Sequence, residues 1–306
     1  MIQAAAIDRA VLDPFGPFAL PFLQRPLVLL LVLAVAAATV GLLVHLRRLE
    51  FIGDGLTHAV FPGLVIGFVV AGSPGLMPGA IVAALAAAVA LTVLARRGTG
   101  DETAIAVLLT AFFSLGVVIV STRRDDAVQL QELFFGRLLT VTDAQLAWSV
   151  GLVAVAVALV AATWRQQVLR AFDVQAARAA GIRILWLDLI ANVAVGLFVV
   201  AAASAIGVLL VLAVLIVPAA AARVMTATIG QAMLAALGFA SVTAWLGLAI
   251  AFDLSVRLSV DAAPGATVAT VMVLAYGLVL GAAALVRRVR ARPGRRIRPL
   301  PGEAAP

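Results

Sequence analysis

The stretch LVLLLVLAVAAATVGLLVHL occupies residues 27–46 and contains no arginine or acidic side chain. A helix of about 20 apolar residues is long enough to cross the hydrocarbon core of a bilayer. Further apolar blocks follow, and together they predict nine spans at residues 27–46, 55–72, 76–95, 104–121, 146–164, 184–203, 206–222, 232–252 and 266–286. Spans in lipid are expected to be helices, because a helix satisfies its own backbone hydrogen bonds. The sequence therefore predicts an all-α polytopic membrane protein.

Composition supports this assignment over the whole chain. Of the 306 residues, 64% are hydrophobic and 12% are charged, whereas a soluble domain carries about 25% charged residues. The chain has no cysteine, which excludes disulfides and thiolate metal sites, and all 22 of its basic residues are arginine. A phosphate-binding loop of the Walker type needs a lysine. We therefore expect a chain that is not an enzyme and does not hydrolyse ATP.

The arginines are distributed unequally between alternate loops. When arginine-rich loops are placed in the cytoplasm, one alternation of the spans puts 16 of the 22 arginines on that side, with the N-terminus outside and the C-terminus inside. The net charge of +7 then reflects membrane topology, and we expect no nucleic-acid binding. This divides the chain into an extramembrane or interfacial arm (1–26), a transmembrane domain (27–286) and a basic cytoplasmic tail (287–306). Because the link at 203–207 is short, spans six and seven are alternatively one broken unit, which leaves eight spans.

Ionisable residues gather where the second span begins, in LEFIGDGLTHAVFPG at residues 49–63. Glu50, Asp54 and His58 are spaced i, i+4, i+8, so on a helix they share one face. A charge at membrane depth costs about 2.5–3.5 kcal/mol, so such residues usually face a bundle interior or a cavity. A carboxylate and an imidazole one turn apart can ligate one divalent cation and suit Zn, Mn or Fe(II). The alternative is a structural hydrogen bond between Asp54 and His58.

A longer cytoplasmic connection reads RQQVLRAFDVQAARAAGIR at residues 165–183. Asp173 is a suitable N-cap, residues 176–180 favour helix, and Gly181 is a suitable stop. We therefore expect a short helix within about residues 170–183. Such a helix either rests on lipid headgroups as an amphipathic segment or docks a cytoplasmic partner.

The seventh span contains Pro218, in LLVLAVLIVPAAAARVMT at residues 209–226. A proline removes one backbone donor and clashes with the preceding turn, so we expect a kink there. The kink serves either a gate or ordinary packing.

Several segments together resemble the permeases of zinc-, manganese- and iron-type ATP-binding-cassette (ABC) importers. The matching stretches are LRRLEFIGDGLTHAVFPG (46–63), DETAIAVLLTAFFSLGVVIVS (101–121), ELFFGRLLTVT (132–142), FDVQAARAAGI (172–182), IGVLLVLAVLIVPAAAARVMT (206–226) and APGATVATVMVLAY (263–276). They occur in the family's order over about 230 residues and include polar positions such as Asp54, His58, Asp173 and Arg223. Glu50 departs from the family, which usually has a small polar or apolar residue there, so it is the weaker candidate.

The resemblance implies the type II ABC importer permease fold in a bacterial cytoplasmic (inner) membrane. It implies a homodimer of permeases, a cytoplasmic ATPase that binds the ATP, and a periplasmic or lipid-anchored metal-binding protein that delivers the ion. It also implies that Asp54 and His58 contact the passing divalent metal ion, which is cargo, with no permanently bound cofactor. The segment at 172–182 then resembles the coupling helix, and its implied ATPase-docking positions are Phe172, Asp173, Ala177 and Gly181.

Three alternatives stay open from the sequence. A siderophore- or vitamin-type ABC permease is expected to have a wider and less ionisable pathway. An ion-coupled secondary transporter predicts inverted repeats with broken helices, and the sequence has no convincing internal repeat. A membrane scaffold that recruits a cytoplasmic partner leaves Asp54 and His58 without a purpose.

Overall fold

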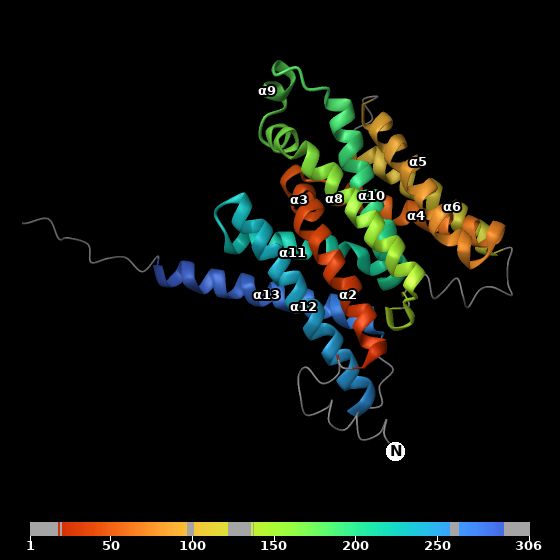
Figure 1. Cartoon of the computed structure of the whole chain (residues 1–306). Helices are drawn as coiled ribbons and strands as arrows, with labels where there is room; N and C mark the ends of the chain where they lie inside the picture. The colour runs from red at the N-terminus through yellow and green to blue at the C-terminus, as the bar shows by residue number, and fades with distance from the viewer. Residues whose placement is uncertain are drawn as a thin grey trace, which may run out of the picture.

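The chain folds into a bundle of long helices, seen in a computed structural model that describes residues 18, 20–96, 101–121, 136, 138–257 and 263–290 (Figure 1). Within these ranges every regular element is helical. The longer elements are α2 (Pro21–Ala36), α3 (Leu42–Arg47), α4 (Glu50–Ala71), α5 (Leu76–Arg96), α6 (Asp101–Ser121), α8 (Asp143–Phe172), α10 (Ile184–Ile206), α11 (Val211–Met225), α12 (Ile229–Arg257) and α13 (Pro264–Arg290). The predicted all-α class is confirmed. Most of the predicted N-terminal arm and of the C-terminal tail lies outside the described residues.

Seven segments in the described part are long and apolar enough to cross a membrane, by length and composition. They are Phe22–Arg47, Glu50–Ala71, Ser73–Arg96, Asp143–Phe172, Ile184–Ala203, Ile229–Val256 and Pro264–Val289. These match seven of the nine spans expected from the sequence. The other two expected spans correspond to shorter apolar helices, Thr103–Ile119 within α6 and Val211–Met225 in α11.

The short link between the sixth and seventh expected spans is a turn between two separate helices. Helix α10 ends at Ile206, and Gly207 has φ +84°, a conformation that glycine adopts without steric cost. A 3₁₀ turn at Val208–Leu210 follows, and α11 begins only at Val211. The span expected to start at residue 206 therefore starts five residues later, because the turn consumes those residues.

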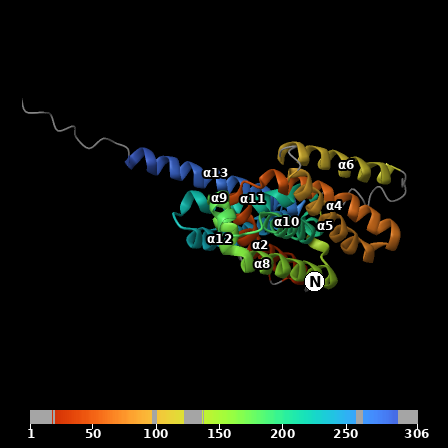
Figure 2. The ribbon, with the colours of Figure 1, turned by 90° about the horizontal axis from the view of Figure 1, so that it is seen from above.

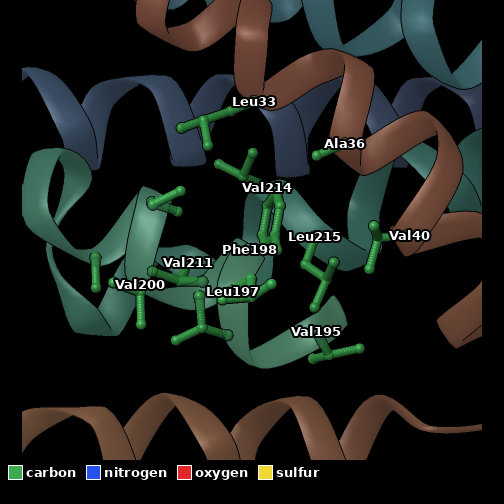
Figure 3. Close-up of a cluster of buried hydrophobic side chains, with 14 of the residues drawn as sticks. Leu33, Ala36, Val40, Val195, Leu197, Phe198, Val200, Val211, Val214 and Leu215 are labelled. Carbon is green, nitrogen blue, oxygen red and sulfur yellow. The ribbon is translucent and has the colours of Figure 1, made fainter. Parts of the chain in front are cut away.

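The core surrounds α10, which is almost completely buried from Ala194 to Ala203. Phe198 is fully buried, and Figure 3 shows it next to Val214 of α11, with Leu33 of α2 beyond Val214. A π-helical segment, Ala37–Gly41, joins α2 to α3 and packs against α11. The bundle thus encloses this part of α10, while many large apolar side chains on the outer faces of the other helices stay exposed.

Two groups of helices flank this core. Helices α4, α5 and α6 lie on one side, while α12 and α13 lie on the other, with α13 extending away from the bundle (Figure 2). The first group is packed closely through glycine. A Cβ added at Gly67 of α4 would fall on the carbonyl oxygen of Gly75, and one at Gly79 of α5 would fall on that of Gly63. This close packing of α4 against α5 fixes the helix that carries Asp54 and His58.

Candidate metal pathway and docking helix

Asp54 and His58 lie one turn apart near the start of α4. With a rise of about 1.5 Å per residue, they sit roughly 6 and 12 Å along the helix from Glu50. The His58 Nε2 and Asp54 Oδ1 atoms are 3.5 Å apart, and the two side chains are 25% and 38% exposed. This separation is longer than an ordinary hydrogen bond. The pair is thus loosely associated and still accessible, as a pair of transit ligands would need to be.

The second ring nitrogen of His58 also makes no strong hydrogen bond within the part of the chain that the structure describes. The Nδ1 atom of His58 is buried and has no hydrogen-bond partner among the residues that the structure describes. Its ring and that of Phe113 of α6 form a T-shaped contact, with ring centroids 5.6 Å apart and planes at 90°. Phe113 therefore fixes the ring by packing, while neither nitrogen is committed to a strong hydrogen bond.

Pro62 adds a backbone feature to the same place. It lies inside α4, four residues after His58, and proline has no N–H to donate to the carbonyl four residues earlier. The carbonyl oxygen of His58 therefore lacks its usual α-helical donor. The turn that carries the pair thus presents a carboxylate, an imidazole and a backbone oxygen released from regular helical pairing.

Glu50 belongs to a different interaction. Its Oε1 atom lies 3.3 Å from Nδ1 of His45 on α3, across a turn in which Arg48 has φ +56°. Among the described residues, no group of three or more histidine, cysteine or acidic side chains is placed to hold a metal ion. The predicted Glu50–Asp54–His58 face therefore divides into a His45–Glu50 pair and an Asp54–His58 pair.

The short helix expected within residues 170–183 is present as α9, Val174–Ala179. The Oδ1 atom of Asp173 accepts a hydrogen bond of 2.9 Å from the backbone N–H of Ala176, as an N-cap does. At the other end, Gly181 has φ +76°, and the Ile182 N–H donates to the Ala177 carbonyl at 3.1 Å. This is the Schellman closure that glycine permits. Both predicted ends of this helix are therefore formed as expected.

The four residues expected at the docking surface are not equally accessible. Phe172 is 72% exposed, and Asp173 and Gly181 are also exposed. Ala177 is fully buried within the chain, so it seats α9 on the bundle. Phe172, the last residue of α8, thus places an exposed aromatic ring directly before α9.

Pro218, the expected kink, is buried inside α11, which continues through it from Val211 to Met225. Its role as a gate stays a prediction.

A polar cluster beside α9 was not predicted from the sequence. Nη1 of Arg47 donates to Oε1 of Gln167 at 2.7 Å, and Nη2 of Arg47 pairs with Asp188. Nε of Arg170 lies 2.6 Å from the same Asp188 carboxylate oxygen. The Arg47 side chain is 1% exposed. We call these four residues the Asp188 cluster; it joins α3, α8 and α10 immediately behind α9.

The sequence held only a faint signal for this cluster. Asp188 falls within an apolar span, where an ionisable side chain is costly and usually paired. Arg47 and Arg170 lie in loops or at helix ends where cytoplasmic arginines are expected anyway. Since Arg47 and Asp188 are 141 residues apart in sequence, nothing local indicates that they meet.

The fold and these features define a multi-pass membrane transport subunit. The chain belongs to the ABC 3 transport family, whose family model matches residues 19–283. The predicted kinship with ABC importer permeases is thereby confirmed.

Named relatives share most of its length. The chain is 28% identical over 228 residues to the manganese transport system membrane protein MntC of Listeria monocytogenes, covering 74% of this chain and 80% of that protein. It is 29% identical over 265 residues to the chelated iron transport system membrane protein YfeD of Yersinia pestis, covering 86% of each. The solved structure of PsaBC from Streptococcus pneumoniae, in complex with a Fab, superposes with a TM-score of 0.77 and 26% identity, covering 96% of this chain and 100% of that one.

Proposed function

We propose that this chain is the membrane-spanning permease of an ATP-driven importer for a divalent transition-metal ion, namely zinc, manganese or iron. The observation that carries the proposal is the Asp54–His58 pair, whose nitrogen and oxygen atoms suit these ions and lie uncommitted on α4. The names of the relatives support manganese or iron among the three.

The pair acts as a transit site. A transport pathway must hold its ion weakly enough to release it, so two or three protein ligands are more suitable than a closed tetrahedral cage. Asp54 and His58 supply two ligands, and a second permease copy lines the other side of the shared pathway without closing a cage around the ion. The ion remains cargo throughout and is not a resident cofactor.

Energy comes from a separate ATPase subunit that docks on α9. ATP binding and hydrolysis there are transmitted through the exposed Phe172 and the capped helix to the bundle. The Asp188 cluster lies directly behind α9, because Arg170 precedes that helix by four residues. Movement of α9 is thereby coupled to α3, whose last residue, Arg47, lies just before the helix that carries the metal pair.

The proposed topology has nine spans of the type II importer kind, in which α6 and α11 are added to the seven longer apolar segments. The N-terminus is outside and the C-terminus inside, so that the arginine-rich helix ends face the cytoplasm. The arm at 1–26 and the tail at 287–306 flank a permease domain at 27–286. A periplasmic or lipid-anchored protein delivers the metal from outside.

The test is metal-stimulated ATP hydrolysis in liposomes that contain this chain, its ATPase and the metal-loaded binding protein. Stimulation by one of the three metals, lost in Asp54→Ala and His58→Ala, supports the transit site. Loss of stimulation in Asp173→Arg, with folding retained, supports docking on α9. The proposal fails if the chain binds no ATPase and moves metal down a proton gradient instead.

A further inference from the structure

A second site lies at the ends of several helices, next to α9. The described residues enclose a cavity of about 480 Å³, within the range of small-molecule pockets. Its wall includes arginines from four different helices, namely Arg47, Arg96, Arg170 and Arg178. Arginines drawn from α3, α5, α8 and α9 thus converge on one space.

Among the side chains that the structure describes, the positive charge of this cavity is poorly balanced. Asp188 is the one acidic side chain among its described lining residues, and it already pairs with both Arg47 and Arg170. Arg96 and Arg178 are exposed, and neither forms an ion pair with a described carboxylate. Two guanidinium groups are therefore available to a ligand that enters the cavity.

This charge decides the class of ligand. Four guanidinium groups repel a divalent cation, so the cavity is a poor resting place for the transported metal. A guanidinium fork matches the oxygens of phosphate and binds them by paired, charge-assisted hydrogen bonds. Basic pockets between transmembrane helices at the cytoplasmic side also suit anionic lipid headgroups. The chemistry common to these ligands is a phosphate group.

We propose that this cavity is an anion site that binds a phosphate group, with Arg96 and Arg178 as its ligands and the Asp188 cluster as its rigid floor. The phosphate is carried by an anionic phospholipid or is a free ion. Binding joins α5 to α9, because one arginine comes from each helix. Occupancy therefore holds the docking helix against the bundle. The site does not depend on which metal is transported.

The test uses the full chain purified in a neutral detergent. Dihexanoyl-phosphatidylglycerol and inorganic phosphate are titrated separately at constant ionic strength, with dihexanoyl-phosphatidylcholine as the uncharged-lipid control. Binding is followed by the thermal unfolding transition in tryptophan fluorescence, for which the chain has 4 tryptophans. Thiol dyes are unsuitable, because the chain has no cysteine.

The decisive comparison is between two double variants of equal charge. Arg96→Gln/Arg178→Gln removes both available ligands. Arg165→Gln/Arg183→Gln removes two exposed arginines that do not line this cavity. We expect saturable stabilisation of the wild type, about tenfold or more weaker binding in the first variant, and unchanged binding in the second.

Each possible result of this experiment either supports or overturns the proposed phosphate site. Stabilisation by phosphatidylglycerol alone identifies a phospholipid, and equal, competing stabilisation by inorganic phosphate identifies a free ion; either supports the site. The proposal is overturned if both double variants lose binding equally, because the effect is then general charge attraction. It is also overturned if the Arg96→Gln/Arg178→Gln variant differs from the wild type only when the ATPase is added, which would make the ligand a carboxylate of that subunit.

Discussion

Arg47 and Asp188 form an ion pair in which the arginine side chain is 1% exposed and the aspartate side chain is 20% exposed. The pair joins the end of α3 to the first turns of α10, and Arg170 completes it from the end of α8. A buried charge without a partner is strongly unfavourable. The pair therefore fixes the relative positions of three helices at the point where they meet α9.

We predict that Asp188→Ala destabilises the protein by about 3–5 kcal/mol, because it leaves the buried Arg47 without its carboxylate. The matched control is Asp143→Ala, which breaks the exposed Arg25–Asp143 pair, whose side chains are 51% and 78% exposed. That change should cost about 0–1 kcal/mol. Tryptophan-fluorescence unfolding in detergent measures both. Equal losses in the two variants would contradict a structural role for the Asp188 cluster.

The glycine contact between α4 and α5 gives a second prediction. Gly67→Ala should destabilise the fold by about 1–3 kcal/mol, as overpacking does, because the new methyl group falls on the carbonyl of Gly75. Gly277→Ala is the control, since nothing lies within 4 Å of a Cβ at that position of α13. There the change should be neutral or stabilising, because alanine favours helix. Unfolding midpoints of the two variants provide the comparison.

Some features of this structure could be predicted from the sequence, whereas others could not. Apolar blocks of span length predicted the helices, because the bilayer sets that length in the sequence itself. Asp173 and Gly181 marked the ends of α9, because capping is local. The Asp188 cluster and the separation of Glu50 from the Asp54–His58 pair depend on which helices pack together. The spacing of residues along one helix does not predict that packing. His45, although only five residues from Glu50, pairs with it because Arg48 turns the chain with φ +56°.

Because Glu50 pairs with His45 while Asp54 pairs with His58, substitutions of the two carboxylates should affect transport unequally. Asp54→Asn should reduce metal-stimulated ATP hydrolysis about tenfold or more, since even supporting partners of metal ligands contribute factors of that size. Glu50→Gln should have a much smaller effect, because its carboxylate lies against His45. Hydrolysis by the reconstituted transporter, measured over a range of metal concentrations, separates the two. An Asp54→Asn variant that transports like Glu50→Gln would remove Asp54 from the pathway.

The last prediction separates docking from folding at α9. Phe172→Ala should leave the unfolding transition unchanged, because the ring is 72% exposed, yet it should weaken ATPase binding, because an exposed aromatic ring is a typical interface anchor. Asp173→Ala should instead cost about 0.5–2 kcal/mol through the lost N-cap, whereas Asp173→Asn keeps a capping oxygen and should restore stability. Co-purification of the ATPase and the unfolding midpoint are measured for all three. Docking is assigned to the exposed ring if Phe172→Ala loses the ATPase at wild-type stability. If it retains the ATPase while Asp173→Ala loses it, the shape of α9 matters and its aromatic neighbour does not.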